Sequence, residues 1–166
     1  STKYSEYVRV KVRKYWVNEK AGVLEKNTSL DPALIKLDID ESVWFKNPNE
    51  STEEEDVYYY CNPLSKAVEG ESNNALPFIT GVTIDNQITT EVVLEGGTKN
   101  ENGSITGNVT NKYIYDNASF YIEIEADAVQ SHNAEAAIYG AWGVHATSTA
   151  EDDGTLTSID GNATGR

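Results

Sequence analysis

Two stretches of strict alternation constrain the fold of this chain more than any other sequence feature. In residues 7–13, valines at even positions alternate with cations at odd positions, namely Val8, Val10 and Val12 with Arg9, Lys11 and Arg13. In residues 119–126, apolar side chains again take the even positions, namely Phe120, Ile122, Ile124 and Ala126, with Tyr121, Glu123 and Glu125 between them. Successive side chains of a strand point to opposite faces, so each stretch predicts a half-buried antiparallel strand.

The outer faces of these two predicted strands carry opposite charges. The outer face of residues 7–13 is basic, and that of residues 119–126 is acidic. Opposed charges on neighbouring strands stabilise a sheet by roughly 0.2–1 kcal/mol per pair. Pairing of the two strands in one sheet would therefore be favourable.

Shorter strand signals and turn residues fill the rest of the chain. Residues 15–17 extend the first strand, and further strands are expected at 42–45, 57–61, 64–68, 76–84, 88–94, 113–115 and 138–144. Asp31-Pro32 predicts a helical turn, residues 127–137 a short helix or an irregular crossover, and residues 95–107 a loop. Roughly eight or nine short strands separated by turns predict an all-β fold, a two-sheet sandwich of jelly-roll or immunoglobulin-like type with one or two short helices.

The length of 166 residues suits one domain. We assign residues 1–145 to the β-sandwich. Residues 146–166, rich in Thr, Ser, Gly and Asp, form a polar C-terminal tail that we expect to be mobile or to order only against a partner. The single cysteine, Cys61, cannot form an internal disulfide, and its apolar, aromatic surroundings favour a buried small side chain.

The charge of the chain limits its partners. A net charge of −14 argues against nucleic acid and anionic membranes. No apolar run approaches the roughly 18 residues that span a bilayer, so we expect no membrane insertion, and no signal peptide remains at the N-terminus. The first 20 residues carry a net +4 and the remaining 146 carry −18. This asymmetry indicates either a basic stripe on a soluble protein or the basic end of a subunit that meets the acidic flank of a neighbour.

The sequence offers little support for catalysis. His132 and His145 adjoin no Gly-x-Ser-x-Gly turn and form no His-Glu-x-x-His motif, and their spacing with Glu135 matches no standard metal site. We therefore predict no catalytic residue, no cofactor and no metal. The aromatic residues Trp16, Trp44, Tyr58 and Tyr59 are consistent with a sugar-binding platform or with core packing, and core packing is favoured.

Several segments, taken in order, resemble a known family. They are residues 7–12 with Tyr15-Trp16, Leu30-Asp31-Pro32, Trp44, residues 58–60 with Pro63-Leu64, residues 122–130, and residues 141–144. This order is similar to that of the TasA/camelysin-like proteins, biofilm matrix proteins that Gram-positive bacteria export through a SipW-type signal peptidase. Camelysin was named as a protease, but no residues here support proteolysis.

The resemblance implies a jelly-roll domain that is secreted to the cell surface or extracellular matrix and assembles into fibres or pili. In such fibres an N-terminal segment of one subunit completes the sheet of the next, so the partners would be copies of the chain or a paralogous subunit. Members of the family usually carry one or more strands before this one, and only six residues precede Tyr7 here, so the resemblance implies that a donor segment is missing from this chain. The tail after Val144 is also longer than the family pattern implies.

We assign a set of residues to subunit assembly or to the core that supports it. They are Tyr7, Val8, Arg9, Val10, Lys11, Val12, Trp16, Trp44, Tyr58, Tyr60, Gln130 and Trp142. The alternative function is that of a monomeric cell-surface module that binds carbohydrate or a host protein through its aromatic loops.

Overall fold

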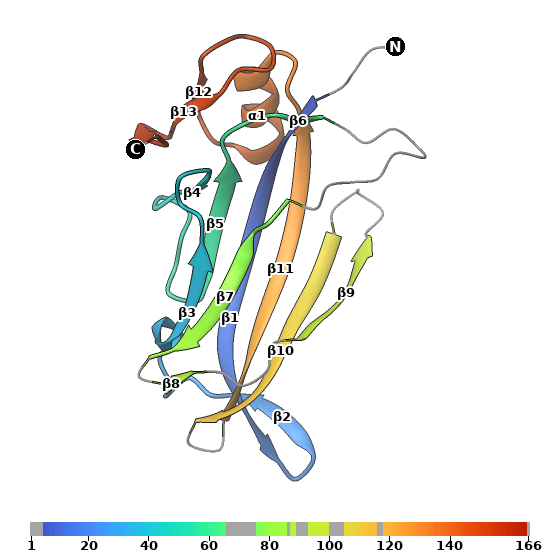
Figure 1. The fold of residues 1–166 in the computed structure, drawn as a ribbon, viewed down its shortest axis with the longest axis vertical. Coiled ribbons are helices and arrows are strands. Elements are labelled where there is room, and N and C mark those ends of the chain that lie inside the picture. Colours follow the sequence, from blue (N-terminus) through green and yellow to red (C-terminus); the bar gives the residue numbers. More distant parts are fainter. Residues whose placement is uncertain are drawn as a thin grey trace.

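The computed structural model describes residues 5–65, 76–85, 87–88, 93–99, 105–115 and 118–165, with 87–88, 93–99 and 105–115 described in backbone only. The described chain is mostly β, with several antiparallel sheets and one short α-helix (Figure 1). This confirms the expected all-β class. Residues 66–68 and 89–92, which the sequence places in strands, lie outside the described residues.

The largest sheet is built around two long strands. Its order is β4 (Trp44–Lys46), β5 (Glu55–Tyr60), β1 (Ser5–Lys20), β11 (Ala118–Gln130), β10 (Ile105–Tyr115) and β9 (Val93–Lys99). Two short strands, β2 (Val23–Lys26) and β6 (Leu64–Ser65), also pair with β1. All of these pairings are antiparallel, and β1 and β11 lie at the centre (Figure 1).

The expected pairing of the two alternating stretches is confirmed. β1 and β11 are antiparallel neighbours over residues 6–18 and 118–130. The register places the three odd-numbered cations of β1 opposite acids of β11, in the pairs Arg9–Asp127, Lys11–Glu125 and Arg13–Glu123. A slip by one residue would move the apolar face of either strand into solvent, so hydrophobic pattern and charge favour the same register.

Two smaller sheets and two helical segments complete the described chain. One sheet contains β3 (Ile35–Ile39), β7 (Ile79–Ile84) and β8 (Gln87–Ile88), and the other contains β12 (Ala146–Ser148), β13 (Leu156–Ile159) and β14 (Asn162–Ala163). The 3-10 turn η1 spans Pro32–Leu34 and the helix α1 spans Ala134–Trp142. The Asp31 side chain accepts a hydrogen bond from the Ala33 N–H, as the expected cap of the Asp-Pro turn.

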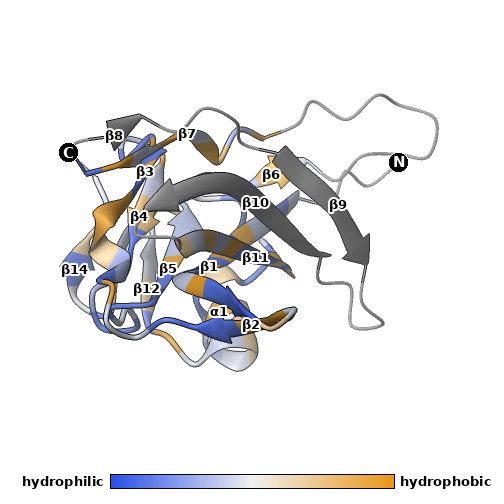
Figure 2. Cartoon of the chain, turned by 90° about the horizontal axis from the view of Figure 1, so that it is seen from below, coloured by the Kyte–Doolittle hydropathy of each residue, from blue (hydrophilic) through white to orange (hydrophobic). Residues whose placement is uncertain are grey.

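The even-numbered face of β1 and β11 packs against β3 and β7. The buried residues of this first core cluster include Val10, Val12, Trp16, Phe120 and Ile122 from the central strands and Ile35, Val82 and Ile84 from β3 and β7. Seen along the long axis, β3 and β7 lie on one side of β1 and β11, while α1 lies on the other (Figure 2). The central strands are therefore covered on both faces over part of their length.

A second core cluster covers the odd-numbered face at one end of the sheet. Its buried residues are Tyr7, Val57 and Tyr59 from the large sheet with Ala134, Ile138, Val144, Ala146, Leu156 and Ile159. The Tyr7 hydroxyl donates to the Gly154 carbonyl at 2.6 Å, which ties the first strand to the C-terminal region. Buried hydroxyls of this kind need such a partner, because an unsatisfied polar group costs about 1–3 kcal/mol.

The strand expected at residues 138–144 is wrong, since residues 134–142 form α1. Two features override the strand-like sequence Ile-Tyr-Gly-Ala-Trp-Gly-Val of this segment. The residues just before it are rich in alanine, and its apolar residues recur every four positions, which is the spacing of one helical face. Ala134 and Ile138 are buried and Trp142 packs against them, so one helical face meets the second core. Gly143 ends the helix with φ 70°, and its N–H donates to the Tyr139 carbonyl.

The expectation of a mobile C-terminal tail is also wrong. Residues 146–163 contain three strands, and Leu156 and Ile159 are 1% and 0% exposed. Asp160 and Gly161, with φ of 50° and 81°, form the two-residue turn between β13 and β14. Likewise the expected loop at 95–107 is largely strand, because β9 extends to Lys99 and β10 begins at Ile105.

Truncation of the tail core tests this placement. We expect Leu156→Ala and Ile159→Ala each to lower the free energy of unfolding by about 2–5 kcal/mol, because each leaves a cavity in the second core. Thr157→Ala, at the exposed position between them, is the matched control, and should cost less than about 1 kcal/mol. Urea unfolding gives the free energy of unfolding of all three variants. If all three lose the same small amount of stability, the C-terminal strands do not pack on the sheet.

Candidate functional site: the charged face of the central strands

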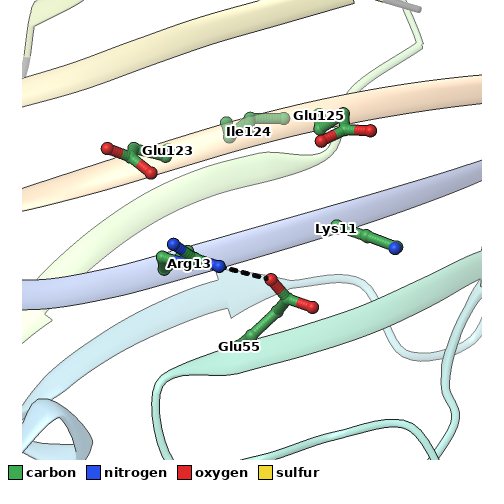
Figure 3. A pocket seen from close by; sticks show the side chains of 6 residues that line it. All are labelled: Lys11, Arg13, Glu55, Glu123, Ile124 and Glu125. Carbon is green, nitrogen blue, oxygen red and sulfur yellow. Dashed lines mark hydrogen bonds and ion pairs between the residues drawn. The ribbon is translucent and has the colours of Figure 1, made fainter.

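A band of charged side chains occupies the odd-numbered face of β5, β1 and β11, beyond the part that α1 covers. Lys11, Arg13, Glu55, Glu123 and Glu125, together with Ile124, line a shallow open pocket of about 160 Å³. Figure 3 shows the two cations on β1 between the acid on β5 and the acids on β11. We call this set the charged band.

The charged band follows directly from strand alternation and register. Arg13 lies opposite Glu55 on β5 and opposite Glu123 on β11. Its guanidinium is 3.3 Å from the Glu55 carboxylate, in a pair whose side chains are 52% and 30% exposed. An exposed pair of this kind contributes about 0.2–1 kcal/mol and is weakened by salt. The band is thus a solvated surface on which two cations lie among three acids.

The opposed cations of β1 and acids of β11 form a row that we call the charged ladder. Toward α1 this charged ladder becomes shielded from solvent. Arg9 and Asp127 form an ion pair at 2.9 Å, with side chains only 12% and 21% exposed. The Arg9 guanidinium also lies 5.0 Å from the centre of the Trp142 ring, in a cation–π contact. Partial burial reduces screening of both contacts. Arg9 therefore links the large sheet to the last residue of α1.

At the opposite end the band finishes in tyrosines. The Tyr15 hydroxyl donates to Glu123 Oε1 at 2.7 Å, and the Tyr15 ring stacks on Tyr121 with centres 5.9 Å apart. Lys26, from β2, lies over the Tyr15 ring and pairs with Glu54. Burial, then the hydrogen bond to Glu123 and its charge, raise the pKa of Tyr15 to about 12. The hydroxyl is a donor here and stays protonated at neutral pH.

The histidines are not assembled into a site. His132 is paired with Asp152 at 2.8 Å near the start of α1, and His145 stacks on Tyr139 with ring centres 4.7 Å apart. Across the described residues, no group of three or more His, Cys, Asp or Glu side chains is placed to hold a metal ion. Among those residues, also, no helix is long and apolar enough to cross a membrane.

The predicted aromatic residues lie in the interior. Trp16 and Trp44 are 0% and 2% exposed, and Tyr58 and Tyr59 are 6% and 0% exposed. Their burial bears out core packing and leaves none of them as an exposed platform for a sugar. Cys61 is 7% exposed, as expected of a small buried side chain, and burial raises the pKa of its thiol.

The structure divides the remaining predicted residues between the core and the two ends of the charged ladder. Val10 and Val12 are buried in the first core cluster, Val8 and Tyr60 border it, and Tyr7 is buried in the second cluster. Lys11 lies in the charged band. Gln130 is exposed at the end of β11, opposite Glu6. Trp142 packs edge-on against Tyr59.

The sequence analysis did not predict a buried hydrogen-bond network around Asn47, which we call the polar tie. Asn47 is 0% exposed, and its Nδ2 donates to Glu50 at 2.8 Å and to Asp160 at 3.2 Å. The Tyr59 hydroxyl donates to the same Glu50 carboxylate at 2.6 Å. The tie joins the loop after β4 to the turn between β13 and β14. Its only local signal is Asn47-Pro48, which indicates a turn but not its partner.

No protein-family model, no curated protein and no solved structure matches this chain. The resemblance to TasA/camelysin-like proteins rests on the sequence segments described above.

Double-mutant cycles compare the two ends of the charged ladder. We expect the coupling free energy between Arg13 and Glu55 to be below about 1 kcal/mol and to fall further in high salt. The coupling between Arg9 and Asp127 should be larger and less sensitive to salt, because both side chains are shielded. Both coupling free energies are obtained from the unfolding free energies of the single and double Ala variants in low and in high salt. Equal couplings with equal salt dependence would contradict the shielding.

Alkaline titration tests the environment of Tyr15. Its pKa of about 12 in the folded state lies above the ordinary value of 10.0. The unfolded chain therefore releases this proton first, so the stability associated with the neutral hydroxyl is present below pH 10 and is lost as the pH rises toward 12. Comparing ultraviolet titrations of the folded protein and its Tyr15→Phe variant should reveal one late-titrating tyrosine. A difference spectrum that titrates near pH 10 would contradict the contact with Glu123.

Proposed function

We propose that this chain is a structural subunit of an extracellular biofilm matrix fibre or pilus. The subunit is a two-sheet sandwich of jelly-roll type, secreted to the cell surface or matrix. It assembles head to tail by β-strand donation, with copies of itself or a paralogous subunit as partners. The order of sequence segments shared with TasA/camelysin-like proteins supports the proposal, and the state of the first core supports it independently.

The single observation that carries the proposal is the incomplete cover of the even-numbered face. Val10, Val12, Phe120 and Ile122 are buried, but their neighbours along the same two strands, including Val8, Ile124 and Ala126, are only partly buried. Leu76, Phe78 and Ile79 are also partly buried at the margin of this cluster. An apolar margin beside short sheets is the kind of surface that an added strand covers.

Free strand edges supply the second requirement for strand donation. Within the described residues, β3 pairs only with β7, and β9 pairs only with β10. An unpaired edge offers a row of backbone N–H and C=O groups to another chain. β1 itself is unsuited to the role of donor, because β11 pairs with one of its edges and β5, β2 and β6 with the other.

The basic character of β1 is largely matched within the subunit. Arg9 and Arg13 pair with Asp127 and Glu55 of the same chain. These internal partners favour a charge ladder inside the fold over a basic end that meets an acidic neighbour. The partly buried apolar margin and the strand edges therefore support assembly, whereas the charge asymmetry of the first 20 residues does not.

Negative-stain electron microscopy of the natively secreted protein, with any residues that precede Ser1 retained, tests the proposal. We expect regular filaments that disappear when the upstream segment is deleted, because that segment would supply the donated strand. Monodisperse particles at high concentration and across pH would contradict fibre assembly. They would favour the monomeric cell-surface binding module instead, for which a ligand-dependent rise in melting temperature is the corresponding measurement.

A further inference from the structure

One cation of β1 lies on the apolar face of that strand. The even positions of β1 are occupied in order by Val8, Val10, Val12, Lys14 and Trp16. Lys14 interrupts this apolar row, and the charged ladder gives it no partner, because that ladder uses the odd-numbered cations. A charge turned toward a core is costly unless it is paired. Lys14 meets this need by donating from Nζ to the Ile35 carbonyl of β3 at 2.6 Å.

The Ile35 carbonyl lies on the outer edge of β3. The Asp85 N–H donates to the Leu34 carbonyl, so residue 34 turns its backbone groups toward the β7 side. Residues of an antiparallel pair alternate between groups turned toward the partner strand and groups turned away from it. Along the register of β3 with β7, Ile35 and Leu37 therefore turn their N–H and C=O groups away from β7. Among the described strands, β3 is the outermost of its sheet, so these groups form its outer edge.

This outer edge is closed at Ile35 and open at Leu37. The Ile35 N–H donates to the Pro32 carbonyl, and the Ile35 carbonyl accepts from Lys14. The backbone N–H and C=O of Leu37 have no partner among the described residues. A strand added beside β3 would bond to Leu37 and would then need the next outward carbonyl, that of Ile35. Lys14 occupies the carbonyl that such a strand requires.

The outer edge of β3 also borders the apolar margin that an added strand would cover. Leu37 and Ile39 are partly buried against the first core cluster. A strand beside β3 would extend the layer that packs on the even-numbered face of β1 and β11. The other free edge, that of β9, belongs to the large sheet itself. A strand added there would lengthen the large sheet and would not extend the layer above it.

Lys14 has a second set of partners if it leaves the edge. Burial lowers the pKa of Lys14, and the negative charge of Asp56 acts against this effect. Lys46 lowers the pKa further, and the charge of Asp31 raises it. A lysine carries its ammonium on a flexible four-carbon stem, which can turn from a carbonyl to a neighbouring carboxylate. Lys14 can therefore release the Ile35 carbonyl without becoming an isolated charge.

We infer that the outer edge of β3 accepts the strand of another copy of this chain, and that Lys14 is the gate of this edge. In the unassembled subunit Lys14 closes the edge at Ile35, as inward-pointing charges protect the edges of natural sheets. The incoming strand displaces Lys14 and takes its place at the carbonyl. The inference rests on the proposed fibre function, for which it names the acceptor edge and the contact that delays assembly.

Assembly rates test the gate. Lys14→Met keeps an unbranched stem and removes the ammonium, so filaments of this variant should form several-fold faster than those of the unmodified secreted protein. Lys36→Met is the matched control, because it removes an exposed cation of β3 that pairs with Asp85 and leaves Lys14 in place. Unfolding curves check that both variants are folded. If Lys14→Met assembles no faster than Lys36→Met, the gate is overturned.

Amide hydrogen exchange tests the acceptor edge in the unmodified protein. The Leu37 amide should exchange several-fold more slowly in filaments than in the unassembled subunit, because the added strand supplies its missing partner. The Ile35 amide is the internal control, since it is bonded to Pro32 in both states. Filaments in which Leu37 exchanges as fast as in the subunit would overturn the edge and leave the fibre function standing. Absence of filaments from the unmodified secreted protein would overturn both.

Discussion

The antiparallel pairing of β1 with β11 is the interaction on which the rest of this structure depends. Two stretches with apolar side chains at even positions lie side by side in one register, so their apolar residues form one continuous face. The same register opposes cations and acids on the other face. Hydrophobic pattern and charge therefore select the same arrangement, and the two core clusters pack against the two faces that this pair creates.

The odd-numbered face of the pair has two different environments. At one end α1 and the C-terminal strands cover it, which buries Tyr7 and shields the contact of Arg9 with Asp127 and Trp142. At the other end the face is open, and Arg13 forms a more exposed pair. One alternating strand thus contributes a core residue, a shielded ion pair and a solvated charge in succession. The alternation is the same along the whole strand. The three environments differ because α1 and the C-terminal strands cover only one end of this face.

The proposed function depends on the apolar surface and strand edges that the described part of the fold leaves uncovered. The first core has a partly buried apolar margin, and the described sheets have edges that a further strand could extend. Strongly exposed large apolar side chains among the described residues lie at opposite ends of the long axis. The central aromatic residues are interior, as core packing predicts, since Trp16, Trp44 and Tyr58 are buried. These features favour assembly with another chain over recognition of a small ligand.

The sequence by itself determined the two long strands, the Asp31-Pro32 turn and the burial of the central aromatics, because each depends on local periodicity or composition. It made the pairing of the two strands favourable, but only the tertiary structure showed that they pair. The members of the charged band could be named from alternation, but their neighbours on β5 required the register. Only the tertiary structure decided that residues 134–142 are helical and that residues 146–163 are ordered. Short segments with few apolar residues cannot bury themselves, so their conformation is set by the face of β1 and β5 against which Ile138, Leu156 and Ile159 pack.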